Sequence, residues 1–535
     1  MKKLITPPNG STFTRRDALR LAAGTGAAAF AGGLLGPDGR ALAATDTSLP
    51  PASSGKTGGT LRVGLAAGGV DDTLDALAPL TLADNARWMQ LFETILINDP
   101  ETLASNPNLA TEFAPNKTGD AWTIRLKDGI EFHNGKTATI DDLIFTLNLS
   151  RTAAIGGVGP FFDKLIDWEN IKKHDDLSAT FQLNRPFSVL DSLFSQPGVV
   201  PLLPEGYEIH TAIGTGPWKL KSFDPGRQSV FVANENYHGG RPLMDELVMI
   251  DLTDDTARLN ALLGGQIDLM VSVPPSMIPV IEGSKVANLM SVDAGFFYPI
   301  VMNCEQAPFD DVRVRQAMRL LADRQQLVDV ALSGYGVVGN DLYGIHDQTY
   351  FNHDIPQREQ DIDQAKFLLK QAGRLDDTFE IKAAPLAAGA REGCQVFAQQ
   401  AQAAGIDVRA RSIDASEWGA NVLNWDFTNS FWPASNYPQF MTLLDSAMGP
   451  YCETHFGTSD PEFAAAADRF FDEVDLEKRV ELGHEVQRLH HDRSGYIIYG
   501  HANTVDAAAA DMTGYVKDSS GFNFGKFNFL KVARA

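Results

Sequence analysis

Residues 379–412 restrict the fold of this chain more than any other stretch, because strand and helix patterns alternate there. Residues 379–383 and 406–412 each have the short apolar pattern of a strand, and a helical pattern covers residues 392–404 between them. Gly405 joins the helix to the second strand. A strand–helix–strand unit implies two parallel strands in one sheet, so this part of the chain is predicted to be an α/β domain.

Further elements are predicted upstream. Residues 59–65 alternate between apolar and polar side chains, as in an opening strand, and residues 121–126 and 129–132 predict a hairpin with Asp128-Gly129 at its tip. A helix is expected after Thr139, and we interpret Asp141 and Asp142 as residues of its first turn rather than as a catalytic pair.

One long helical segment is predicted over residues 310–332, with Asp310 or Asp311 as its N-cap. Its apolar stripe contains Val314, Ala317, Met318 and Leu321. Arg313, Arg315 and Arg319 fall off that stripe, so we expect them to form a solvated, ion-paired face.

The length of 535 residues is too great for one ordinary core, and two or three packed domains are expected. The formal charge of −23 would repel a polyphosphate, which excludes nucleic acid as a ligand. Three cysteines, Cys304, Cys394 and Cys452, permit at most one intramolecular disulfide. They lack metal-ligand spacing, and we interpret them as buried small residues.

The N-terminal 43 residues have the order of an export signal. A charged segment at residues 14–20 precedes a mildly hydrophobic run rich in Ala and Gly at 21–36 and a small-residue cleavage site at 41–43. The pair Arg15-Arg16 resembles a twin-arginine signal, and the general secretory route remains open. The apolar run is too short and too rich in glycine to anchor the chain in a membrane. Residues 44–58 are expected to form a flexible leader.

No catalytic motif is found. The zinc-protease pattern fails at His484-Glu485, because Arg488 occupies the position of the second histidine. The sequence has no nucleophile elbow and no phosphate-binding loop, and Gly214-Thr215-Gly216 is followed by Pro217 instead of a helix with a third glycine. We therefore expect no enzyme, no cofactor and no metal.

Several ordered sequence blocks resemble the family 5 extracellular solute-binding proteins, which serve peptide, nickel, opine and related ABC importers. The strongest block covers residues 121–135 (AWTIRLKDGIEFHNG) and continues to residue 146. Further blocks lie at residues 214–220, 234–237, 258–269, 302–317 and 365–373.

This resemblance implies an α/β fold of two lobes, of the type II-like periplasmic-binding-protein class, with an extra subdomain in the first lobe. The expected division is residues 59–96, 214–300 and 505–535 for the first lobe, 97–213 for the inserted subdomain, and 301–504 for the second lobe. A solute would be enclosed when the two lobes close.

The resemblance places ligand contacts in four regions: the loop 66–75, the strand near Tyr298 and Asn303, the loop 385–391, and the segment 425–439. Arg391 could bind a ligand carboxylate through a bidentate fork, or could be a surface residue at a helix start. Tyr298 and Trp432 could stack on a ligand, or could be core aromatics.

In peptide binders of the family an acidic residue of the last segment pairs with the α-amino group of the ligand. This chain has Asn436 or Ser435 at that place, unless Asp426 or Asp445 supplies the charge. An ammonium group is costly to bury without a counter-charge. A modified peptide, an opine or a sugar conjugate is therefore favoured over an ordinary peptide.

The function expected is that of a monomeric, periplasmic substrate-binding component in a Gram-negative cell. Its partners would be a small peptide-like solute and an ABC permease in the inner membrane. Two alternatives remain open: a periplasmic hydrolase or processing enzyme, and a holdase-type chaperone or sensor on the same fold.

Overall fold

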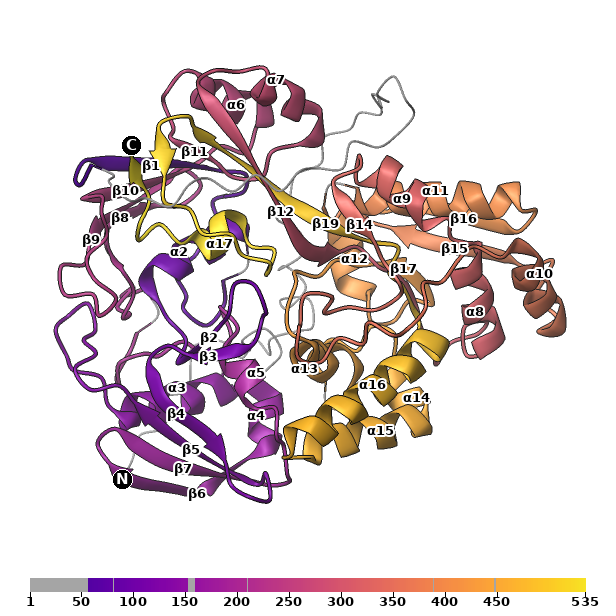
Figure 1. The fold of residues 1–535 in the computed structure, drawn as a ribbon, viewed down its shortest axis with the longest axis horizontal. Coiled ribbons are helices and arrows are strands. Elements are labelled where there is room, and N and C mark those ends of the chain that lie inside the picture. The colour runs from indigo at the N-terminus through magenta and orange to yellow at the C-terminus, as the bar shows by residue number, and fades with distance from the viewer. Residues whose placement is uncertain (1–55, 80, 153–158, 209, 388, 447–448) are drawn as a thin grey trace.

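The computed structural model describes residues 56–535 apart from residues 80, 153–158, 209, 388 and 447–448. The predicted signal peptide and most of the predicted leader lie outside the described residues. The chain forms three main sheets (Figure 1), which we use to name its parts. The first lobe contains the eight-stranded sheet, the subdomain the four-stranded sheet, and the second lobe the five-stranded sheet.

The sheet of the first lobe has the order β12-β19-β11-β1-β10-β9-β8, and β14 also pairs with β19. Its strands are Thr60–Leu65 (β1), Trp218–Asp224 (β8), Gln228–Ala233 (β9), Glu246–Asp251 (β10), Leu269–Met270 (β11), Ala287–Phe297 (β12), Gly336–Val338 (β14) and Gly500–Ala509 (β19). The predicted opening strand is confirmed as β1, which is parallel to β10 and β11, and Leu61, Val63 and Leu65 along it are fully buried.

Helices and short turns cover this sheet. They are Leu82–Leu91 (α2), Asp255–Leu263 (α6), the 3-10 turn Pro275–Met277, Ile278–Glu282 (α7), and the short turn Asn523–Phe527 (α17), whose backbone is left-handed at Phe524, Gly525 and Lys526. A small hairpin of Met512–Thr513 (β20) and Ala533–Arg534 (β21) ends the chain.

The subdomain is an antiparallel sheet with the order β4-β5-β7-β6. Its strands are Ala110–Pro115 (β4), Ala121–Leu126 (β5), Ile166–Asp175 (β6) and Ser178–Leu183 (β7). Its helices are Ile140–Thr152 (α3), Gly159–Leu165 (α4) and Asp191–Phe194 (α5), and the hairpin of Leu96–Asn98 (β2) and Ser105–Pro107 (β3) precedes the sheet. The predicted helix after Thr139 is confirmed as α3, with Asp141 and Asp142 in its first turn.

The predicted hairpin at residues 121–132 is wrong in its second half. β5 pairs with β4 and β7 instead, and Glu131 forms an isolated bridge with Thr137. A strand with partners on both sides has no free edge, so the segment after Gly129 cannot pair with β5.

The chain returns from the subdomain to the first lobe through Gly214-Thr215-Gly216. A Cβ atom at Gly214 would lie 2.0 Å from the carbonyl oxygen of Leu91, and one at Gly216 would lie 2.3 Å from that of Gln90. These glycines are therefore required by close packing against the C-terminal end of α2.

The sheet of the second lobe has the order β16-β15-β17-β13-β18. Its strands are Ile300–Met302 (β13), Thr378–Ala383 (β15), Asp407–Ser412 (β16), Phe427–Asn429 (β17) and Tyr496–Ile497 (β18). The parallel pairing of β15 with β16 around Ala390–Ala403 (α11) confirms the predicted strand–helix–strand unit.

The other helices of the second lobe lie around this sheet and below it in Figure 1. They are Val312–Leu321 (α8), Arg324–Ala331 (α9), Ile362–Gln371 (α10), Ala415–Asn421 (α12), Tyr437–Phe440 (α13), the π-helical turn Met441–Asp445, Phe456–Ser459 (α14), Pro461–Asp472 (α15) and Leu476–Arg493 (α16).

The predicted single helix over residues 310–332 is two helices. α8 has Asp311 as its N-cap, and Asp323 caps a second helix, α9, by accepting a hydrogen bond from the backbone N–H of Gln326. An aspartate that bonds to a backbone N–H three residues ahead starts a new helix.

The expectation of a solvated arginine face is correct only for Arg313. Arg315 and Arg319 are buried, and they donate hydrogen bonds to backbone carbonyls at the C-terminal end of α16.

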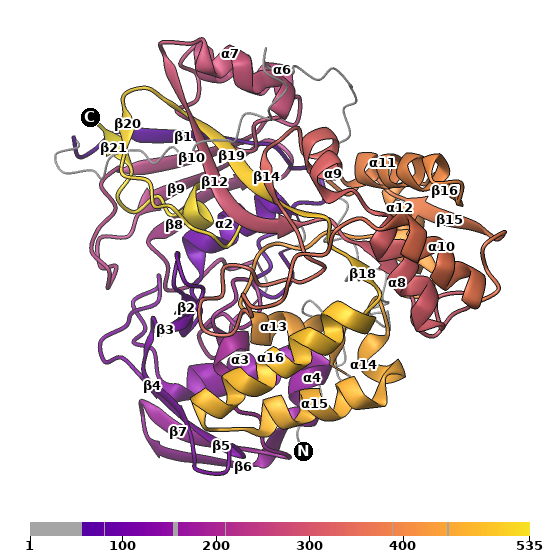
Figure 2. The ribbon, with the colours of Figure 1, turned by 45° about the vertical axis from the view of Figure 1, so that its right-hand side comes forward.

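The chain passes between the first and second lobes between β12 and β13 and between β18 and β19, and it also reaches the sheet of the first lobe at β14, between α9 and α10. β12 and β19 run side by side as an antiparallel pair that carries a register shift between Asp293 and Phe296 (Figure 2). Among the described residues no helix has the length and apolar character that a membrane span needs.

Candidate functional site

Tyr298 lies at the first crossing between the lobes, in the two-residue link between β12 and β13. Its ring is partly buried, and its centroid is 5.8 Å from that of Phe296. Burial raises the pKa of its hydroxyl to about 12, so Tyr298 stays neutral at physiological pH. A neutral phenol at the junction of the two lobes can stack on a ligand or donate a hydrogen bond to it.

Aromatic side chains from a distant segment join Tyr298. Phe431 stacks on Phe296 with 6.2 Å between ring centroids and 14° between ring planes. Tyr298, Trp425 and Phe431 pack, partly buried, on one apolar cluster that includes Leu386 and Ala390. The structure thus brings together three of the four predicted contact regions. Sequence reasoning did not select Phe296, Trp425 or Phe431 as single contacts.

Arg391 lies in the first turn of α11, directly after Ala390. Its Nη2 atom is 3.4 Å from Oε1 of Glu392, and its Nε atom is buried without a hydrogen-bond partner among the described residues. Ala390, its neighbour in the chain, belongs to the cluster on which Tyr298, Trp425 and Phe431 pack. A guanidinium group with an unused donor is suited to bind a planar anion such as a carboxylate.

Trp432 points to the other side of the same segment. Its backbone N–H donates to the carbonyl oxygen of Phe297 in β12 at 2.9 Å, and its carbonyl oxygen accepts the N–H of Phe297 at 3.0 Å. Its indole Nε1 donates to Oε2 of Glu453 at 3.3 Å, and its ring packs on Tyr451. The side chain of Trp432 is therefore separate from the group of Tyr298, Phe431 and Arg391, although its backbone lies beside β12.

Asn303 and Asn436 are both used by the local fold. Asn303 directly follows β13, and its Oδ1 accepts the backbone N–H of Glu305 at 3.0 Å. Asn436 is the N-cap of α13, and its Oδ1 accepts the backbone N–H of Gln439 at 3.0 Å. Its Nδ2 also reaches 3.5 Å from the carbonyl oxygen of Leu103, between β2 and β3. The amide of Asn436 thus bridges the second lobe and the segment that leads into the subdomain.

The two acids that could replace the missing counter-charge already have partners. Asp426 pairs with Nζ of Lys382 at 2.6 Å. Asp445 is fully buried, accepts the hydroxyl of Tyr343 at 2.5 Å and lies 3.2 Å from Nε2 of His490. Ser435 bonds through its hydroxyl to the side chain of Gln439.

Glu453 is an acid that sequence reasoning missed. It is 2% exposed and accepts hydrogen bonds from the hydroxyl of Ser430 at 2.6 Å and from the indole of Trp432. Burial raises its pKa to about 7 against the opposing effect of these two hydrogen bonds. No sequence signal marks it, because it lies more than twenty residues from both of its partners.

The loop after β1 is held by a buried cluster around Arg87 of α2. Arg87 donates to Asp72 at 2.8 Å and to both carboxylate oxygens of Asp251 at 2.6 and 2.8 Å, and it lies 3.4 Å from Asp84. Asp72 belongs to the loop 66–75, so the cluster fixes the conformation of this predicted contact region. A buried guanidinium that is bonded on several sides gives a rigid anchor.

Comparison with known proteins identifies the family to which the chain belongs. The family model described as bacterial extracellular solute-binding proteins, family 5 middle, matches residues 105–451. The chain belongs to this family.

Curated relatives of this family 5 protein span most of its length. It is 25% identical over 472 residues to the dipeptide-binding protein of Escherichia coli, and the alignment covers 80% of this chain and 86% of that protein. It is 24% identical over 453 residues to the glutathione-binding protein of Salmonella paratyphi A, covering 78% and 84% of the two chains.

Solved structures confirm the two-lobed α/β fold. A periplasmic binding protein of Helicobacter pylori, solved with the peptide STSA, superposes with a TM-score of 0.74 at 19% identity, covering 90% of this chain and 98% of the other. A binding protein of Agrobacterium, solved with agropinic acid, gives a TM-score of 0.74 at 19% identity with 89% and 99% coverage. The predicted fold class and family are therefore correct.

The family consists of substrate-binding proteins for transporters, and this chain is such a component of an ABC importer. Among the described residues no group of three or more His, Cys, Asp or Glu side chains is arranged to hold a metal ion.

Proposed function

We propose that this protein binds a small solute with a carboxylate group between its two lobes in the periplasm of a Gram-negative cell, and delivers it to an ABC permease of the inner membrane. It would act as a monomer and release the solute unchanged, and would not be an enzyme. The single observation that carries the ligand class is Arg391, whose buried Nε has no hydrogen-bond partner among the described residues and which directly follows Ala390 of the cluster that holds Tyr298, Trp425 and Phe431.

The residues proposed to contact the solute are Arg391 and Tyr298, joined by Phe296, Trp425 and Phe431. Arg391 would bind the carboxylate with two parallel hydrogen bonds, and the rings would cover the apolar part of the solute. Asn303, Trp432 and Asn436 remain proposed contacts through atoms that their structural hydrogen bonds leave free.

A free ammonium group has no available counter-charge in this set. Asp426 and Asp445 are paired, and Glu453 is covered by Ser430 and Trp432. This supports a modified peptide, an opine or a sugar conjugate over an ordinary dipeptide. The names of the relatives span dipeptides, glutathione and heme, so membership of the family leaves this choice open.

The proposed division of the chain agrees with the three sheets except at β14 and the first half of β19, which pair in the sheet of the first lobe. Residues 59–96, 214–300 and 505–535 would form the first lobe, 97–213 the subdomain and 301–504 the second lobe. The proposed export signal covers residues 1–43, with twin-arginine translocation as the proposed route.

The test is a thermal-shift screen in which each compound with a free carboxylate is compared with the corresponding amide. Glutathione, dipeptides and opines are the first probes. We expect compounds with the free carboxylate to stabilise the protein and their amides to fail. Arg391→Gln should weaken binding of an active compound about 30-fold or more, because truncation of one partner of a buried charged pair costs roughly 2–5 kcal/mol.

Arg409→Gln is the matched control. Arg409 lies on β16 of the same lobe, and its guanidinium pairs with Asp407 in an exposed position. Equal affinities of the Arg391 variant and this control for the active compound would refute the assignment of Arg391.

A further inference from the structure

The subdomain and the second lobe meet at a contact distinct from the chain crossings between the lobes. Figure 1 shows β12 and β19 in the upper half of the molecule, whereas α15 lies against the subdomain in the lower half. One apolar cluster runs through both parts, from Trp122 and Phe194 in the subdomain to Phe463 and Phe470 in α15. This contact is held by residues 185–188, the segment between β7 and α5.

Ser188 caps the C-terminal end of α15 from the subdomain. Its backbone N–H donates to the carbonyl oxygen of Phe471 at 2.6 Å, and its hydroxyl is 2.8 Å from the same oxygen and 2.5 Å from that of Glu473. The last carbonyls of a helix have no partner within the helix, so they need an outside donor when buried. Ser188 is 1% exposed, and this donor therefore comes from another part of the molecule without intervening solvent.

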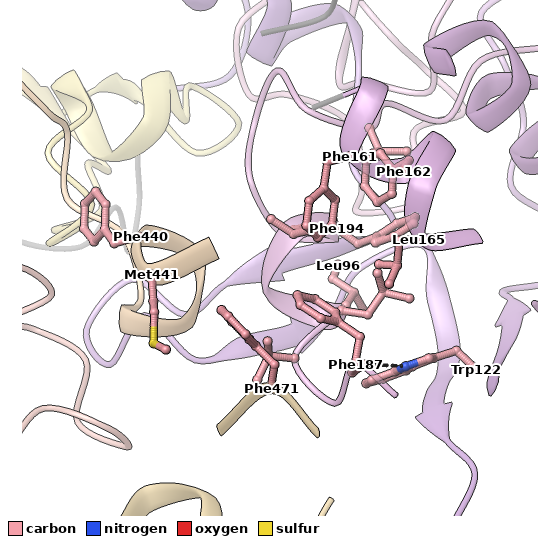
Figure 3. Packing of buried hydrophobic residues seen from close by; sticks show 14 of the residues in the cluster. Leu96, Trp122, Phe161, Phe162, Leu165, Phe187, Phe194, Phe440, Met441 and Phe471 are labelled. Carbon is pink, nitrogen blue, oxygen red and sulfur yellow. Dashed lines mark hydrogen bonds between the residues drawn. The ribbon is translucent and has the colours of Figure 1, made fainter. Parts of the chain in front are cut away.

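Phe187 stacks on Phe471 beside this cap, with 5.1 Å between ring centroids and 24° between ring planes (Figure 3). The indole N–H of Trp122 on β5 donates to the carbonyl oxygen of Phe187 at 2.9 Å, which ties the segment to the subdomain sheet. Both phenylalanine rings are buried. Separation of the two parts would expose both rings to water, which is unfavourable.

Arg185 adds a charged contact. Its Nη2 donates to Oδ1 of Asp468 and to Oδ1 of Asp472, both at 2.9 Å. Both acids lie near the C-terminal end of α15, where the negative end of the helix dipole disfavours a carboxylate. The positive charge of Arg185 offsets this unfavourable interaction for both carboxylates. These side chains are half-exposed, so this ion pair contributes less than the buried cap.

We propose that Arg185, Phe187 and Ser188 form a latch that closes on the C-terminal end of α15 and sets the ratio of the closed to the open form. The inference rests on the proposed function in one respect, namely that the two lobes open and close around a solute. The subdomain thereby acts on the second lobe at a distance from β12, β14 and β19, the strands at which the described chain passes between the lobes.

The cap of Ser188 has a selective effect on the two forms. When the lobes are open, water can reach the carbonyls of Phe471 and Glu473, so the hydroxyl of Ser188 contributes nothing there. When the lobes are closed, removal of the hydroxyl takes one of two donors from the carbonyl of Glu473, which then keeps only Nη1 of Arg479 at 2.9 Å. Ser188→Ala therefore weakens the closed form alone, and the apparent affinity for a solute falls with the closed fraction.

The experiment measures this ratio without a solute. Spin labels at Lys172→Cys on β6 and Glu477→Cys on α16 report the distance between the subdomain and the second lobe by pulsed EPR. The background carries Cys452→Ser, because Cys452 is partly exposed. We expect Ser188→Ala to raise the open-to-closed ratio of the ligand-free protein roughly twofold to tenfold, the net value of one hydrogen bond, and Arg185→Glu to raise it as well.

Two matched variants serve as controls. Ser150→Ala removes a buried hydroxyl that bonds to the carbonyl of Thr146 within α3, and Arg125→Gln removes an ion pair with Asp175 within the subdomain. Neither should change the distance distribution. Asp472→Arg should restore the short distance in the Arg185→Glu variant, because the charges are then exchanged.

Identical distance distributions for the wild-type protein, Ser188→Ala and Arg185→Glu would overturn the latch. Failure of Asp472→Arg to restore the short distance would remove Arg185 from it. Because no solute enters the distance measurement, a failure of the proposed ligand class would leave the latch untouched. A failure of the latch would likewise leave the proposed ligand class untouched.

Discussion

Glu453 shows how a buried carboxyl group makes stability depend on pH. Its pKa is about 7 in the folded protein and 4.5 for a free side chain, because burial disfavours the charged form. The folded state therefore binds a proton more strongly than the unfolded state. Stability is highest below pH 4.5 as far as this group is concerned, and it falls as the pH rises to about 7.

Glu453→Gln should remove this dependence while keeping both hydrogen bonds, since an amide oxygen can accept from Trp432 and its NH₂ can donate to Ser430. We expect the variant to match the wild type near pH 5 and to be more stable at pH 8, by on the order of 2–3 kcal/mol. Urea unfolding at both pH values measures the difference. Glu112→Gln, exposed on β4, is the control, and parallel pH profiles for wild type and Glu453→Gln would contradict the assignment.

Arg391 remains a prediction as a ligand contact, and the sequence could not show why Asn436 stands where an acid was expected. Asn436 caps α13 and contacts Leu103, which lies 333 positions away in the chain. The choice between ligand contact and cap depends on which atoms remain free after folding.

At the scale of elements, α8 illustrates a limit of helical periodicity. The pattern of residues 310–332 is continuous, yet Asp323 starts a second helix. Charge alone placed Arg315 and Arg319 on a solvated face. The structure places them under the C-terminal end of α16, because its unpaired carbonyls need donors.

Arg319→Met tests this role. Arg319 is fully buried and donates to the carbonyl oxygens of His491 at 2.7 Å and Asp492 at 2.5 Å. Methionine fills similar volume without donors, so we expect a loss of about 2–4 kcal/mol in the free energy of unfolding. Denaturant unfolding of the purified protein measures this loss.

Arg313→Met is the control for the same helix. Arg313 is exposed, and its ion pair with Asp311 should be worth less than about 1 kcal/mol. Equal losses for the two variants would show that burial under α16 is not what makes Arg319 important.

At the scale of the whole molecule, the connections between the two lobes and the contact of the subdomain with α15 define how the lobes can move. Solute binding should shift the population to the closed form. A solute at 100 times its dissociation constant should stabilise the fold by about 2.7 kcal/mol. Small-angle scattering should show a smaller radius of gyration with the saturating solute, and the Ser188→Ala variant, which starts more open, should contract further.

Mass spectrometry of the solute after long incubation separates this function from the alternatives. Recovery of the intact compound agrees with a binding protein. A chemically changed compound would favour a hydrolase, and binding of unfolded polypeptides without sequence preference would favour a chaperone.

The sequence alone was sufficient for the family, the α/β class and the main local elements, including β1, α3 and the unit of β15, α11 and β16. Those features depend on side-chain periodicity and on capping residues a few positions apart. Tertiary structure alone decided that Phe431 joins Tyr298, that Glu453 lies beneath Trp432, and that residue 188 caps a helix ending at residue 472. Burial and pairing across hundreds of residues exist only once the sheets have packed, so no local pattern in the chain records them.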